Sequence, residues 1–76
     1  MTPYLRLAGE SGVVAYRSGG EAISVRFVDG KVYTYTYASA GAQHIEQMKR
    51  LAQAGKGLCG YISKHVHDNY ASVEGP

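Results

Sequence analysis

The 76-residue sequence lacks the features that mark secreted and membrane-spanning proteins. Its single cysteine, Cys59, excludes an internal disulfide framework. No stretch is long and apolar enough to span a membrane, and none has the basic start and apolar run of a secretory signal peptide. These absences predict a cytoplasmic protein in a reducing environment, with no membrane partner.

The sequence also lacks the common catalytic patterns. It has no paired carboxylates, no Ser-His-Asp order and no cofactor fingerprint. Cys59 and the three histidines include the residue types of a thiol catalyst or a zinc site, but no orienting Asp or Asn pattern accompanies the cysteine, and the histidines are scattered. The run Gly55-Lys56-Gly57 is too short for a phosphate-binding loop, so we interpret it as a helix end and a turn. We therefore expect no enzyme activity, no catalytic residues, no metal and no cofactor.

The composition is that of a small globular domain. Apolar residues make up 45% of the sequence and charged residues 18%, which is too apolar for a disordered chain. A chain of this length has one thin core, because it buries only about 60% of the surface that its unfolded form exposes. We expect an extended arm over residues 1–12, a single domain over residues 13–70 and a C-terminal tail over residues 71–76.

Alternating residues predict three β-strands in the first half of this domain. In Ala22–Val28 the apolar residues Ile23, Val25 and Phe27 occupy every second position, and in Lys31–Tyr37 tyrosine alternates with threonine. Asp29-Gly30 between these runs is a strong hairpin signal, because glycine adopts positive φ without steric cost. Together with Val13–Arg17 before them, these strands are expected to form an antiparallel meander.

The register of the hairpin decides which way the tyrosines of its second strand face. A two-residue loop pairs Val28 with Lys31 and places the tyrosines on the face of Arg26. A three-residue loop with a glycine bulge pairs Phe27 with Lys31 and places them on the face of Val25. We favour the bulged register, because so small a domain needs the buried area of the tyrosines to hold its helices.

After Tyr37 the spacing of apolar residues changes from two to about 3.6, which predicts helices. Ser39 is the expected N-cap of a helix over Ala40–Ala54, which Gly55 ends. A second helix is expected over Leu58–Val66. The predicted fold is therefore α+β, a three-stranded antiparallel β-meander followed by two α-helices packed on one face of the sheet.

A set of aromatic, apolar and glycine positions runs through these elements. Its centre is Tyr33-Thr34-Tyr35, and its other members are Tyr16, Ile23, Val25, Phe27, Gly30, Lys56-Gly57, Ile62 and Tyr70. From Val13 to Tyr70 this pattern resembles the KTSC domain, whose hallmark is a central Tyr-x-Tyr. Many members have Val-Pro after the last strand, where this sequence has Ala38-Ser39-Ala40. The family occurs in small bacterial proteins and at the C-terminus of some lysyl-tRNA synthetases, so the resemblance implies RNA binding, and it supplies no catalytic residues.

The charge distribution is compatible with an RNA partner. The net charge is +2, and the segment Lys49–His67 contains no acidic residue. Aromatic rings stack on unpaired bases, and lysine and arginine neutralise phosphates. The expected RNA-binding residues are Arg26, Tyr33, Tyr35, Tyr37, Lys49, Arg50, Lys56 and Lys64. The competing interpretation is that the tyrosines are core residues and the lysines cover a solvated helix surface.

The alternative function is a protein-interaction module. Such a domain would dock onto a larger complex, or onto a second copy of itself, through a sheet edge or a helix surface. Basic residues clustered on one surface would favour RNA, whereas an exposed apolar or tyrosine patch beside an open edge strand would favour protein.

Overall fold

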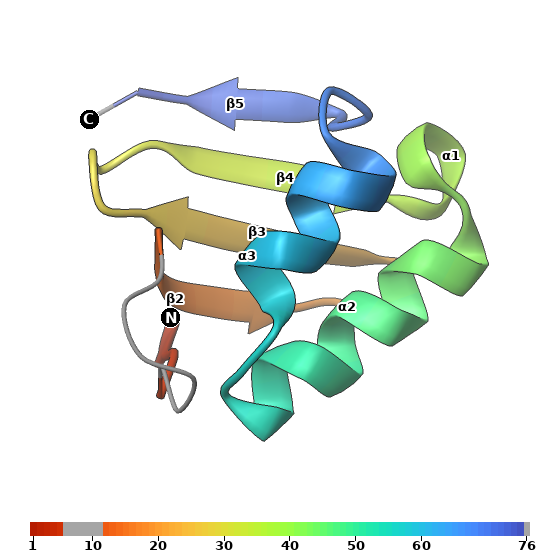
Figure 1. Ribbon diagram of the computed structural model, residues 1–76. Coiled ribbons are helices and arrows are strands. Elements are labelled where there is room, and N and C mark those ends of the chain that lie inside the picture. The colour runs from red at the N-terminus through yellow and green to blue at the C-terminus, as the bar shows by residue number, and fades with distance from the viewer. Residues whose placement is uncertain (6–11, 76) are drawn as a thin grey trace.

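The computed structural model describes residues 1–5 and 12–75, which form a five-stranded antiparallel sheet with helices across one face (Figure 1). The strands, in their order across the sheet, are β1 (Thr2–Pro3), β2 (Val13–Ser18), β3 (Ala22–Phe27), β4 (Val32–Thr36) and β5 (Ser72–Glu74). The helices are α1 (Tyr37–Ala40), α2 (Ala42–Ala54), α3 (Leu58–Tyr61) and the π-helix η1 (Ile62–Val66). The predicted α+β class is confirmed.

The predicted number of strands is wrong, because β1 and β5 add a short edge strand on each side of the expected meander. Thr2 pairs with Tyr16, and Val73 pairs with Tyr33. Strands of two and three residues are too short to show a period-two pattern. Parts of the expected arm and tail thus belong to the sheet, while residues 6–11 of the arm lie outside the described residues.

The bulged register of the β3–β4 hairpin is confirmed. The Phe27 N–H donates to the Lys31 carbonyl oxygen at 3.0 Å, and Val25 pairs with Tyr33. Gly30 has a φ of 89°, the left-handed conformation that a glycine bulge requires. The tyrosines of β4 consequently face the helices, and Tyr35 is only 1% exposed.

The first helix starts earlier than expected and is interrupted. Thr36 is the N-cap, because its Oγ1 accepts the Ser39 N–H at 3.0 Å while Ser39 Oγ accepts the Thr36 N–H at 3.0 Å. This capping box starts the single turn α1, and Gly41, with a φ of 96°, separates α1 from α2. The prediction of Ser39 as N-cap is therefore wrong. Thr36 continues the tyrosine–threonine alternation of the strand, so the sequence pattern does not show that its side chain caps a helix. The expected end at Gly55 is confirmed by its left-handed φ of 79°.

The second predicted helix has the expected bounds, but its second half is the π-helix η1. The Leu58 N–H at its start donates to Tyr4 Oη at 3.1 Å. Tyr4 is 5% exposed, so a residue from the expected arm is a core residue. The helix ends at His67, a non-glycine residue with a positive φ of 28°.

The hydrophobic core lies between the sheet and the helices. Its buried members are Tyr4, Val13, Ile23, Val25, Tyr35, Ile45, Met48, Ala52, Leu58, Ile62 and Val66. The helices all lie on one side of the sheet (Figure 1), and the other side includes Ser24 and Thr34, whose hydroxyl oxygens are 2.8 Å apart. Among the described residues, no helix has the length and apolar character needed to cross a membrane.

Candidate functional site

The structure distributes the predicted RNA-binding residues over several surfaces. Tyr33 and Tyr35 lie on the helix-facing side of the sheet, whereas Arg26 pairs with Val32 and lies on the opposite side. Tyr35 is buried, so its ring is not accessible for base stacking in the folded chain. Tyr33 is half-buried. The sheet therefore does not combine these tyrosines with Arg26 in one binding surface.

Tyr37 and Lys49 are engaged in contacts within the protein. Tyr37 Oη donates to Glu46 Oε2 at 2.7 Å, which raises the pKa of Tyr37 and lowers the pKa of Glu46. Lys49 Nζ donates to the same carboxylate oxygen at 3.0 Å and to the Gly20 carbonyl oxygen at 2.9 Å. The Lys49 side chain is only 15% exposed. These bonds fix α2 against the turn between β2 and β3.

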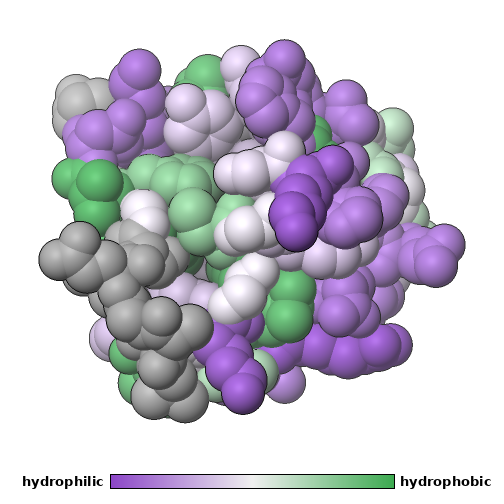
Figure 2. Space-filling view, in the orientation of Figure 1, coloured by the Kyte–Doolittle hydropathy of each residue, from purple (hydrophilic) through white to green (hydrophobic). Residues whose placement is uncertain are grey.

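Arg50, Lys56 and Lys64 are exposed on the helical side of the molecule. Arg50 Nη1 donates to Gln47 Oε1 at 3.2 Å. Within residues 1–5 and 12–75, neither Lys56 nor Lys64 forms a side-chain hydrogen bond or ion pair. In the view of Figure 2, hydrophilic residues gather on the right, over α2 and its neighbours. Arg26 is exposed as well, but on the opposite side of the sheet, so these three cations are the exposed members of the predicted set on the helical side.

A polar hollow of about 420 Å³ lies between α2 and α3, and we call it the α2–α3 hollow. Its lining residues are Gln43, Glu46, Gln47, Arg50 and Tyr61. Gln43 and Arg50 each lie three or four residues from both Glu46 and Gln47, which places the four residues on one face of α2. The hollow thus combines two amides, one guanidinium and one aromatic ring, along with a carboxylate that is already paired with Lys49.

Tyr61 at the wall of this hollow belongs to a cluster of three rings. Its Oη is 2.6 Å from His44 Nδ1. Its ring centroid is 4.4 Å from that of His65, and the two planes are tilted by 36°. The His44 and His65 centroids are 5.7 Å apart. A flat base can stack on such a group of rings.

The ring cluster is not evident from the sequence alone. There the histidines suggest only part of a thiol catalyst or a metal site, and His44 lies in a different helix from its partners. The spacing of four residues between Tyr61 and His65 was the available signal, since residues four apart in a helix lie side by side. In the described part of the chain, no three His, Cys, Asp or Glu side chains gather in a geometry that could hold a metal ion.

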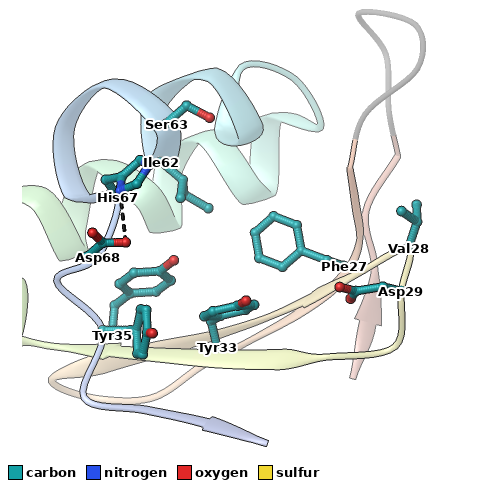
Figure 3. Close-up of a pocket in the computed structure, with 10 residues that line it drawn as sticks. Phe27, Val28, Asp29, Tyr33, Tyr35, Ile62, Ser63, His67 and Asp68 are labelled. Carbon is teal, nitrogen blue, oxygen red and sulfur yellow. Dashed lines mark ion pairs between the residues drawn. The ribbon is translucent and has the colours of Figure 1, made fainter. Parts of the chain in front are cut away.

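A second cavity of about 400 Å³ lies between the sheet and η1 (Figure 3), and we call it the tyrosine pocket. Its lining residues are Phe27, Val28, Asp29, Tyr33, Tyr35, Ile62, Ser63, His67, Asp68 and Tyr70. Figure 3 shows Ile62 pointing from the helical layer toward the sheet, from which Tyr33 and Tyr35 rise. Burial raises the pKa of Tyr35 to about 12, with smaller contributions from Tyr33, Tyr70 and Asp68. The Tyr35 hydroxyl therefore remains protonated at neutral pH.

Comparison with protein-family models, with curated proteins and with solved structures gave no match. The resemblance to the KTSC domain consequently stays a prediction from the sequence.

Proposed function

We propose that this chain is a noncatalytic domain that binds single-stranded or looped RNA through the outer face of its helices. The observation that carries the proposal is the α2–α3 hollow, where Tyr61 lines the same cavity as Gln43, Gln47 and Arg50 and also contacts the rings of His44 and His65. Unpaired bases are recognised by stacking on rings and by hydrogen bonds to their edges, and the hollow offers groups of both kinds.

Each lining group has a role in this proposal. The rings of Tyr61 and His65 form the stacking surface, and the amides of Gln43 and Gln47 can both donate to and accept from a base edge. The Arg50 guanidinium is suited to a phosphate. Lys64 is exposed and directly precedes His65 in η1, so it supplies a second cation near the rings.

The acidic member of the hollow does not oppose an RNA backbone. Glu46 Oε2 accepts hydrogen bonds from Tyr37 and Lys49, and these bonds lower the pKa of its carboxyl. Its charge is thus balanced locally by Lys49 at 3.0 Å. The resemblance to a domain attached to lysyl-tRNA synthetases also supports RNA as the partner.

The proposal is tested by fluorescence anisotropy of labelled single-stranded RNA and a labelled stem-loop at about 50 and 200 mM salt. We expect binding that weakens with salt, and an Arg50→Ala/Lys64→Ala variant whose salt slope is lower by about 1 to 1.5. The control is Arg17→Ala/Lys31→Ala, which removes the same charge from exposed residues outside the hollow. Absence of binding at low salt, or equal effects of the two variants, would contradict the proposal.

The β5 edge favours protein interaction as the second candidate. The three residues of β5 are exposed, Val73 is 43% exposed, and β5 is the last strand on its side of the sheet. An open edge strand can pair with a strand of another chain. A pull-down with the wild-type chain and with Val73→Pro as bait tests this candidate, since proline blocks strand pairing.

A further inference from the structure

The tyrosine pocket has a different binding chemistry from the α2–α3 hollow. Four aromatic rings line it, on Phe27, Tyr33, Tyr35 and Tyr70. The Tyr33 ring meets the Tyr70 ring at a centroid distance of 5.0 Å and the Phe27 ring at 5.3 Å, both edge to face. These contacts hold the rings in place, and the face of each ring carries a negative electrostatic potential.

Among the residues that the structure describes, the charged groups of the pocket are predominantly acidic, although the chain as a whole has a net charge of +2. Asp29 and Asp68 line the pocket, and no described lysine or arginine does. Asp68 lies 2.9 Å from His67 Nδ1, which is charged only when the ring is protonated. Asp29 accepts the Lys31 backbone N–H at 2.9 Å, and in the described part of the chain it has no ion pair.

The pocket also presents hydroxyls without a partner in the protein. Among the described residues, the hydroxyls of the half-buried Tyr33 and Tyr70 form no hydrogen bond within the protein, whereas Tyr35 is 1% exposed and offers little surface to a ligand. A hydroxyl oxygen and a carboxylate both direct lone pairs toward a positive group. The rings, hydroxyls and carboxylates therefore all favour a positively charged ligand.

The backbone on the helical rim departs from regular helix. The π-helix Ile62–Val66 contributes Ile62 and Ser63 to the pocket, and His67 follows it with a φ of 28°. A π-turn and a non-glycine residue with positive φ are both unfavourable relative to regular helix, and both occur frequently at functional sites. Here both lie at the edge of the aromatic pocket.

We propose that the tyrosine pocket binds a methylated ammonium group, carried by a small molecule or by a lysine side chain. Its volume of about 400 Å³ lies in the range of ligand pockets and is large enough to admit a methylated ammonium group with its stem. Aromatic cages with nearby carboxylates attract such cations through the ring faces. Methylation matters because an unmodified ammonium is strongly hydrated and leaves water less readily.

The test is an NMR titration of the isotope-labelled chain with choline, with its neutral isostere in which carbon replaces nitrogen, and with a short trimethyllysine peptide. We expect saturable shifts at Tyr33, Tyr70 and His67, and binding of choline or the peptide about 3- to 30-fold tighter than that of the isostere. Tighter binding of the peptide than of choline would assign the group to a protein partner, and the reverse order to a small molecule.

A variant pair tests the role of the carboxylates. Asp68→Asn should weaken binding of the preferred cation, whereas Glu74→Gln, which removes the same charge from outside the pocket, should not. Asp68 and Glu74 are both exposed, so neither substitution disturbs the core. Equal binding of cation and isostere, no saturable shift up to about 10 mM ligand, or equal effects of the two variants would overturn the proposal.

Discussion

Tyr33 and Tyr35 show how two identical residues on one face of a strand acquire different roles. Both face the helices, but Tyr35 is in the core while Tyr33 is half-buried in the pocket wall. Tyr70 contacts both rings, at centroid distances of 5.0 Å from Tyr33 and 6.3 Å from Tyr35. The alternation of the strand predicts their common face, whereas their separate environments depend on Tyr70, which lies far along the chain.

The buried Tyr35 hydroxyl should make folding stability depend on alkaline pH. Burial raises its pKa from 10 to about 12, so above pH 10 the unfolded chain loses this proton before the folded chain does. The contribution of Tyr35 to the free energy of unfolding is fully present below pH 10. It should fall by about 1.4 kcal/mol per pH unit between pH 10 and pH 12. Urea unfolding of the wild type and of Tyr35→Phe measures it. Parallel stability curves for the two proteins would contradict the assignment.

Among the helices, the break between α1 and α2 depends on the backbone of a single residue. Gly41 has a φ of 96°, and no heavy atom lies within 4 Å of the position that a Cβ would take. Glycine is therefore needed here because of the backbone conformation, and not because a side chain would clash with a neighbour. Gly60 in α3 has similarly open surroundings, and its φ is not in the left-handed region. The two glycines form a matched pair for substitution.

Alanine should have opposite effects at these two positions. We expect Gly41→Ala to lower the free energy of unfolding by about 1 kcal/mol or more, because alanine is strained at positive φ. Gly60→Ala should raise it by about 0.5 to 1 kcal/mol, because alanine favours a helix interior. Thermal or urea unfolding of both variants provides the measurement, and stabilisation by Gly41→Ala would rule out the positive φ at this position.

The sequence predicts elements whose pattern is local and long enough to be recognised. The β3–β4 hairpin, its bulge at Gly30 and the helix end at Gly55 follow from neighbouring residues. The burial of Tyr4 does not, because it depends on a hydrogen bond to Leu58, which is 54 positions away. The contact of His44 with Tyr61 is likewise made by tertiary packing of two helices. For this reason the composition of the α2–α3 hollow emerges only in three dimensions.

At the scale of the whole molecule, the structure separates tyrosines and cations that the sequence pattern suggests as one RNA-binding set. The tyrosines of β4 border a pocket with acidic groups, whereas the exposed Arg50 and Lys64 lie on the helices beside a different set of rings. An RNA backbone is repelled by carboxylates and attracted by cations. The charge distribution therefore favours the helical face for RNA and the tyrosine pocket for a cation.

The most direct test of this account compares RNA binding by Tyr61→Leu and Tyr33→Leu, with circular dichroism to establish that both variants are folded. Leucine retains an apolar side chain but removes the ring, and loss of one stacked base weakens binding by about 5- to 150-fold. We expect this loss for Tyr61→Leu and near wild-type affinity for Tyr33→Leu. Loss of RNA binding by Tyr33→Leu, with binding retained by Tyr61→Leu, would contradict an RNA site on the helical face and would place that site at the sheet tyrosines.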